Sequence, residues 1–182
     1  IVAINREVDA KTAKEINKIF LEIIIAPGFS KEALDILTLK KNIRLLELKD
    51  ITAGKEEKSF DIKRVSGGIL IQESDNTLYN ESKLFVVTKT APDKEQTDDM
   101  EFAMKVVKHI HSNGIAVVKG KKTLGVGAGQ VNRIWAVENA ISRSLENVEG
   151  AVLASDAFFP FDDCVTMAAS AGIKAIIQPG GS

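Results

Sequence analysis

The 182-residue chain has little of the chemistry that metals and disulfides need: one cysteine, Cys164, and two histidines, His109 and His111. A single cysteine excludes an intrachain disulfide framework and indicates a reducing compartment, so we predict a cytoplasmic location. The histidines are two residues apart, and on a helix this spacing points them in different directions, so they cannot share a metal ion. The zinc-deaminase signature, H-x-E followed by P-C-x-x-C, is absent as well. The sequence therefore predicts chemistry without a metal.

Net charge and long apolar runs are also lacking. The 24 basic and 25 acidic residues leave a formal charge of −1, which predicts no nucleic-acid partner. The apolar runs are far too short to span a membrane, and the first residues, IVAINREVD, lack the regions of a signal peptide. The chain has no initial methionine and opens inside an apparent strand, so we expect it to be a piece of a longer protein.

Short apolar runs alternate with amphipathic segments, a pattern typical of a layered α/β fold with largely parallel strands. The polar segment 50–59 is the predicted linker. Asp9, Ser30 and Asp93 are expected to cap helices, and Asp93 resembles a capping box with Gln96. Strands are predicted at 1–4, 23–26, 43–48, on both sides of Gly67-Gly68 within 62–72, and at 84–88, 151–154 and 173–177. Two more, 115–118 and 123–126, are predicted to form a hairpin around 119–122. Helices are predicted at 9–20, 30–37, 93–112, 131–145 and 163–171.

The most informative stretch is ASDAFFPFDD, residues 154–163, which follows a buried apolar strand. It gathers three phenylalanines within four positions of a chain that is only 5% aromatic, with acidic residues on both sides. Rings can stack on a flat heterocycle and carboxylates can accept its N–H groups, so this stretch predicts a ligand pocket. A packed loop before a helix is the competing interpretation.

The glycine run GVGAGQ, residues 125–130, lies between a predicted strand and a predicted helix. Glycines allow a ligand close to the backbone, but the spacing is neither a dinucleotide fingerprint nor a P-loop, and a tight turn explains it equally. Arg133 in the first turn opposes the helix dipole and so needs a partner or a ligand. Asn113 is either the C-cap of the preceding helix or an amide that orients a substrate.

Four further residues carry two interpretations each. Cys164 is a nucleophile or a small buried side chain, and the second is favoured. Glu22 is an acid at the mouth of a strand or simple surface charge. Lys41, with its neighbour Lys40, meets a phosphate or ends a helix favourably. Lys108-His109 is more simply a solvated helix face than an acid–base pair.

Eight segments together resemble the AICAR transformylase / IMP cyclohydrolase family, in its transformylase part. They occur in the order of the family and cover nearly the whole chain: IVAINREVD, EIIIAPGF, RVSGGILIQ, FVVTKTAP, VVKHIHSN, TLGVGAGQVNRI, ASDAFFPFDD and IIQPGGS. The resemblance implies a cytidine-deaminase-like α/β fold used twice, without zinc. Residues 1–55 would be the end of an incomplete first copy and residues 56–182 most of the second.

The same resemblance implies the reaction. A formyl group passes from the co-substrate 10-formyltetrahydrofolate to the 5-amino group of AICAR ribotide, on the route to IMP. That amine is a poor nucleophile because its lone pair is delocalised into the imidazole, so positioning and proton removal must carry catalysis. The family is homodimeric, with its transformylase sites at the subunit interface.

Site residues carry over by position. Asn113 would orient the reacting groups, Arg133 and Ile134 would line the nucleotide and folate site, Phe158 would pack against a ligand ring, and Asp163 would bind the pterin-like head of the folate.

Three further positions complete the set implied by the resemblance. Glu22 would lie near the nucleotide, Lys41 would contact its phosphate, and Ser182 matches a further pocket position.

The chain also departs from the family pattern. The catalytic Lys-His pair of the family lies upstream of IVAIN, the cyclohydrolase domain lies further upstream, and a segment after PGGS carries a phosphate-binding arginine. We therefore expect a piece truncated at both ends, which is inactive by itself. The alternatives are a non-catalytic nucleotide- or folate-binding module and, on the glycine run alone, a Rossmann-type oxidoreductase, which the glycine spacing disfavours.

Overall fold

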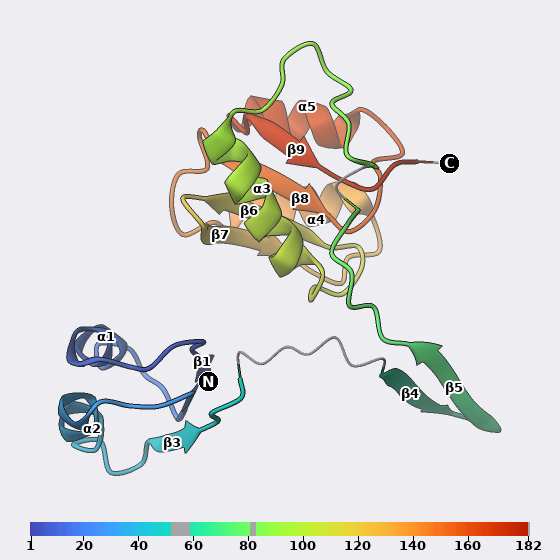
Figure 1. Ribbon diagram of the computed structural model, residues 1–182. Helices are drawn as coiled ribbons and strands as arrows, with labels where there is room; N and C mark the ends of the chain where they lie inside the picture. The colour runs from blue at the N-terminus through green and yellow to red at the C-terminus, as the bar shows by residue number, and fades with distance from the viewer. Residues whose placement is uncertain (52–58, 81–82, 182) are drawn as a thin grey trace. The chain divides into compact units, whose positions relative to one another are not determined.

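The computed structural model describes residues 1–51, 59–80 and 83–181, and the chain divides into two units, Ile1–Ser74 and Asp75–Ser182 (Figure 1). Most of the predicted linker 50–59 lies outside the described residues. The predicted division into family subdomains at residue 55 stays a prediction. Among the described residues, no helix combines the length and apolarity that crossing a membrane requires.

The first unit opens with a small parallel sheet and two helices. Strands β1 (Val2–Ala3), β2 (Ile23–Ala26) and β3 (Arg44–Glu47) lie in that order, and α1 (Ala10–Ile16) and α2 (Lys31–Leu37) connect them. As predicted, Asp9 Oδ1 accepts from the Thr12 N–H at 2.7 Å, and Ser30 Oγ accepts from the Ala33 N–H at 3.2 Å. The buried side chains that form the core of this unit are Val8, Ala13, Ile16, Ile24, Ala26, Ala33 and Leu37.

A β-hairpin ends the first unit. Strands β4 (Phe60–Val65) and β5 (Gly68–Glu73) pair antiparallel across a two-residue turn, in which Gly67 has a φ of 84°. This positive φ explains the glycine, because other residues rarely adopt it. Every residue of both strands is exposed.

The second unit is a three-layer α/β/α structure around a mixed sheet of order β7-β6-β8-β9. Its strands are β6 (Ile115–Lys119), β7 (Lys122–Gly127), β8 (Val152–Ser155) and β9 (Ala175–Ile177), and its helices are α3 (Lys94–Val107), α4 (Arg133–Ser142) and α5 (Asp163–Ser170). Alternate side chains of β6 point to opposite faces: Ala116 and Val118 pack with α3, whereas Ile115 and Val117 pack in the cluster of α4 and α5.

The strand directions correct one prediction. Largely parallel strands were expected, and this holds for β1, β2 and β3. In the second sheet β6 and β7 form the predicted hairpin, but β6 is also antiparallel to β8, and only β8 and β9 run parallel. The short hairpin turn after β6 forces the first of these reversals.

Two local predictions are also wrong. Residues 84–88 form no strand, because β propensity needs a partner strand and none pairs with this segment in the described structure. Helix α3 ends at Val107 with Lys108 as its C-cap, so Asn113 is not the C-cap of that helix.

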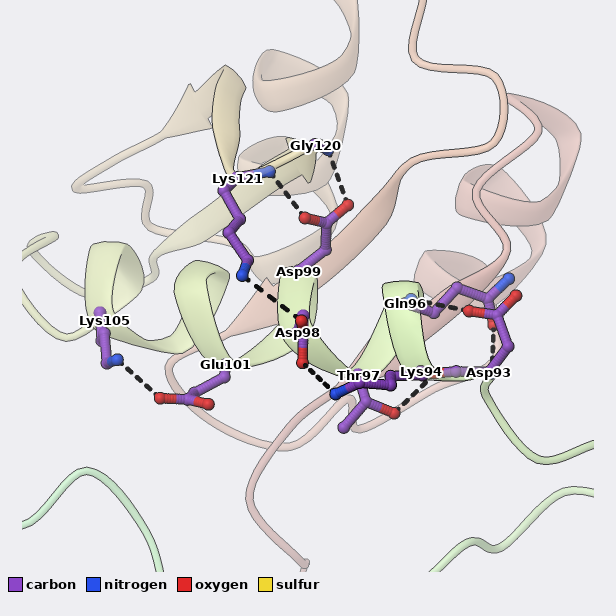
Figure 2. A network of polar contacts seen from close by, with 10 residues as sticks. All are labelled: Asp93, Lys94, Gln96, Thr97, Asp98, Asp99, Glu101, Lys105, Gly120 and Lys121. Carbon is purple, nitrogen blue, oxygen red and sulfur yellow. Dashed lines mark hydrogen bonds and ion pairs between the residues drawn. The ribbon is translucent and has the colours of Figure 1, made fainter.

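Helix α3 is joined to the hairpin of β6 and β7 by a buried carboxylate (Figure 2). Asp99, only 5% exposed, accepts hydrogen bonds from the backbone N–H groups of Gly120 at 2.8 Å and Lys121 at 2.7 Å. The predicted capping box of Asp93 and Gln96 starts the same helix. Asp99 thus satisfies two turn donors and fixes the hairpin against the helix.

Candidate functional site

A hollow of about 340 Å³ lies in the second unit, where β6 begins and β8 ends. Five of the eight predicted site residues line it: Asn113, Arg133, Ile134, Phe158 and Asp163. The other lining residues are Val131, Asn132, Ala157, Pro160, Phe161 and Cys164. A second hollow of about 400 Å³ lies at the opposite end of these strands, around Lys119 and Lys174. We take the first as the candidate site, because the second contains no predicted site residue.

The predicted need of Arg133 for a partner is met inside the chain. Asn132 caps α4, accepting from the Ile134 N–H at 3.2 Å, and so places Arg133 in the first turn. The Arg133 side chain is 9% exposed; its Nη1 donates to Ser155 Oγ at 3.2 Å and forms a close ion pair with Asp156. The ion pair offsets the desolvation cost of burying the charged guanidinium.

Asp156 connects this arginine to the start of β6. Besides pairing with Arg133, its Oδ1 accepts from the Gly114 N–H at 2.9 Å. Burial raises the pKa of Asp156, but hydrogen bonds from Ser112, Gly114 and Arg133 and the arginine charge outweigh it, so the pKa is lowered overall. The carboxylate is therefore ionised at neutral pH and ties two walls of the hollow together.

Asn113 is held by the loop before α4. Its backbone N–H and its side-chain Nδ2 both donate to the carbonyl of Gln130, at 3.1 and 2.7 Å. These bonds fix the amide plane, so that Oδ1 is the acceptor left on the other side. The structure thus replaces the C-cap interpretation of Asn113 with an amide oriented in the wall of the hollow.

The glycine run serves packing at two of its positions. A Cβ on Gly125 would lie 1.9 Å from the Ala140 carbonyl oxygen, and one on Gly127 would lie 1.9 Å from that of Ala136. Both glycines therefore let β7 lie directly against the backbone of α4. Gly129 differs, because its φ is 63° and its Cβ position is open.

The three phenylalanines of 154–163 separate into two roles. Phe159 is half-buried against the core, and its N–H donates to Gln178 Oε1 at 2.8 Å. Phe158 and Phe161 line the hollow and are exposed. The tail passes close by, since a Cβ on Gly181 would lie 3.3 Å from the Phe158 ring. Phe159 thus packs as in the loop interpretation, Phe158 and Phe161 line a hollow, and ligand binding by this stretch stays a prediction.

Cys164 and Asp163 begin α5 at the edge of the hollow. The thiol is buried, and burial, followed by the hydrogen bond and negative charge of Asp163, raises the pKa of Cys164 to about 11. A thiol with this pKa is almost entirely protonated at neutral pH, which agrees with the favoured non-nucleophilic interpretation. Asp163 is exposed, although one carboxylate oxygen accepts from the Cys164 N–H at 2.7 Å.

Two further predicted site residues are not among those that line this hollow. Glu22 and Lys41 are exposed residues of the first unit, before β2 and β3, and so at the amino-terminal edge of its parallel sheet. Lys40 instead uses its ammonium group to bond the carbonyls of Asn17 and Ile19. The prediction for Ser182 lies outside the described residues.

Sequence reasoning missed the part played by Ser155 and Asp156. They belong to the stretch singled out for its rings and acids, but only the fold brings them to Arg133, 23 positions away from Asp156. The available signal was an acid directly after a buried strand, at the strand end where α/β sheets bind ligands. Within the described ranges, no three histidine, cysteine, aspartate or glutamate side chains form a group that could hold a metal ion.

Comparison with known proteins gives the family. The sequence profile of the AICARFT/IMPCHase bienzyme matches residues 1–143. The whole chain aligns with bifunctional purine biosynthesis protein PurH of Acetivibrio thermocellus at 60% identity, of Ruminiclostridium cellulolyticum at 57% and of Fusobacterium nucleatum at 56%. It covers 35% of each of these relatives, and so spans about a third of their length. With most of its length matched, the chain belongs to the AICARFT/IMPCHase bienzyme family.

Proposed function

We propose that this chain supplies part of the ligand site of an AICAR formyltransferase in purine biosynthesis. The reaction transfers a formyl group from 10-formyltetrahydrofolate to the 5-amino group of AICAR ribotide. The observation that carries the proposal is the hollow at the start of β6, which brings together five of the residues that the family resemblance implies: Asn113, Arg133, Ile134, Phe158 and Asp163.

The chemistry of these residues suits a flat, nitrogen-rich ligand. Phe158 and Phe161 offer exposed ring faces, and aromatic rings stack on heterocycles. The carboxylate of Asp163 can accept ring N–H groups, and Asn113 offers an oriented amide. Within the proposal Asp163 holds the pterin-like head of the folate, Phe158 packs on a ligand ring, and Asn113 orients the reacting groups.

The hollow offers binding groups and one carboxylate, that of Asp163, which the proposal assigns to the folate. Among the residues that line it, none is a histidine or a lysine, and the Cys164 thiol, with a pKa of about 11, stays protonated. Removal of a proton from the AICAR amine needs a base with a pKa near neutrality. We therefore expect the 182-residue chain to bind ligands without catalysing the transfer, its general base being the Lys-His pair of the family.

This feature also favours the second candidate function, a non-catalytic nucleotide- or folate-binding module. Both candidates predict the same binding residues. They differ for a protein of the relatives' full length, which transfers formyl groups only under the first candidate. Formyl transfer measured spectroscopically on such a protein separates them, and turnover by the 182-residue chain alone would overturn its expected inactivity.

The binding experiment is titration calorimetry of the 182-residue chain with folic acid and, separately, with AICAR ribotide. Asp163→Asn should weaken folic acid binding about tenfold, because a charged acceptor is lost. Asp162→Asn is the matched control, since this neighbouring exposed acid does not line the hollow. Equal losses in both variants would show that Asp163 acts through net charge alone and would contradict its assigned contact.

Three residues complete the proposal on the nucleotide side: Glu22 near the nucleotide, Lys41 at its phosphate and Ser182 at a further pocket position. We also propose a homodimer whose sites lie at the subunit interface, and a cytoplasmic location. AICAR ribotide titrated into Lys41→Ala tests the phosphate contact, and an unchanged affinity would refute it.

A further inference from the structure

The hairpin of β4 and β5 has one apolar face that nothing covers in the described structure. Because opposite residues of an antiparallel pair point to the same side, Phe60, Ile62, Ile69 and Ile71 share this face. Their side chains are 61%, 68%, 61% and 63% exposed. An isolated two-stranded hairpin is marginally stable in water, and stability needs further strands or a packed face.

The backbone shows which groups are free to pair with another strand. The pair Val65 and Gly68 closes a two-residue turn, so it is a hydrogen-bonded pair, and such pairs recur at every second residue. The bond from Ser74 N to Ser59 O, 2.9 Å long, fits this alternation. Phe60, Ile62 and Arg64 therefore direct their backbone N–H and C=O groups to the open edge of β4.

When β4 strands of two copies of the chain pair antiparallel, one register places their opposite charges across from each other. If two β4 strands pair antiparallel about Ile62, Asp61 of each copy lies opposite Lys63 of the other, and Phe60 lies opposite Arg64. Shifting the centre to Asp61 or Lys63 also aligns the free backbone groups, but it places like charges opposite each other. Within the hairpin Asp61 faces Gln72 and Lys63 faces Leu70, so neither has a cross-strand partner of opposite charge.

We propose that two copies of this chain pair antiparallel through β4, with Ile62 at the two-fold axis, and join their hairpins into a four-stranded sheet of order β5-β4-β4-β5. The charge pattern favours a second copy as the partner strand. Opposite charges placed symmetrically on either side of Ile62 are needed only when β4 pairs with itself. The pairing places the apolar faces of both hairpins side by side. This proposal does not depend on the proposed formyl transfer, and the experiment that tests it uses no ligand.

Disulfide trapping in the 182-residue chain tests the pairing. Opposite residues of a hydrogen-bonded antiparallel pair have Cα atoms about 5.5 Å apart, within the range of a disulfide. Ile62→Cys should form a covalent dimer on oxidation, and the native Cys164 is buried. Ile71→Cys is the matched control: it lies on β5, about 14 Å from its copy across three strand spacings, and should stay monomeric. Trapping of Ile71→Cys alone, or of neither variant, overturns the proposal.

Charge exchange tests the register on the Ile62→Cys background. Asp61→Lys and Lys63→Asp should each slow dimer trapping about tenfold, because each creates two like-charge pairs. The double variant, and an equal mixture of the two single variants, should restore the rate, which a misfolded hairpin would not do. Asp35→Lys, a charge reversal at an exposed position of α2, should leave the rate unchanged. If the single charge reversals leave the trapping rate unchanged, or if the double variant does not restore it, the proposed register is wrong.

Discussion

Removal of the Asp156 carboxylate should destabilise the second unit, because it leaves the Arg133 guanidinium buried without its counter-charge. The two side chains are 18% and 9% exposed, so water screens the pair only weakly. Breaking a buried ion pair by deleting one partner costs about 3–5 kcal/mol. The partial exposure of Asp156 places Asp156→Ala at the lower end, at about 3 kcal/mol. Asp156→Asn should cost less, because an amide oxygen can still accept from the Gly114 N–H.

The measurement is urea unfolding of the 182-residue chain, followed by the fluorescence of its one tryptophan. Trp135 lies on α4 and is 50% exposed, so it reports on the second unit. Asp162→Ala is the matched control, because the Asp162 side chain makes no capping bond and a surface change costs within about 0.5 kcal/mol. A loss below about 1 kcal/mol for Asp156→Ala would refute a buried pair.

The pH dependence of the free energy of unfolding tests the same ion pair in a second way. Because the pKa of Asp156 is lowered by folding, its stabilising contribution is complete above the unfolded value of about 3.9 and is lost as pH falls through the lower folded value. The wild-type chain should therefore lose more free energy of unfolding below about pH 4 than Asp156→Asn, which cannot titrate there. Identical acid profiles would contradict this assignment.

Three other outcomes follow from local geometry. Asp99→Ala should cost about 2 kcal/mol in urea unfolding, because two backbone N–H groups lose their acceptor. Its half-buried neighbour Asp98 makes only surface ion pairs, so Asp98→Ala should cost under about 1 kcal/mol. Gly127→Ala should abolish the tryptophan-reported transition or lower its midpoint strongly, since the new Cβ meets a carbonyl of α4 at 1.9 Å; Gly68→Ala, with open space, should fold normally. The Cys164 thiol should react with a disulfide reagent at pH 8 at least about tenfold more slowly than in urea-unfolded chain, and equal rates would refute a raised pKa.

The sequence predicts best those features that neighbouring residues decide. Asp9 and Ser30 each accept from a backbone N–H three residues ahead, and the Asp93 capping box spans the same distance. Such contacts depend on local geometry alone, so the amino-acid sequence is enough to predict them. The continuous apolar runs of β6 and β8 also identified buried strands correctly.

Features that depend on distant partners were beyond the sequence. Leu84 to Thr88 has the composition of a strand, but the described structure provides no strand beside it. The direction of β8 relative to β6 follows from the route of the chain around α4, which no local pattern specifies. Arg133 was recognised as needing a partner, but the choice between a ligand and Asp156 required the fold.

That choice changes which charges of the hollow are free for a ligand. Arg133 looks like an anion-binding group in the sequence, yet one nitrogen of its guanidinium is committed to Ser155 and Asp156, and the pair is neutral overall. Asp163 is exposed, and among the described residues it accepts from its neighbour Cys164, through the backbone N–H and the thiol. The hollow therefore presents a net negative charge beside two exposed rings, and this favours ligand parts rich in N–H donors over phosphates. A phosphate group would then have to be bound by residues outside this hollow.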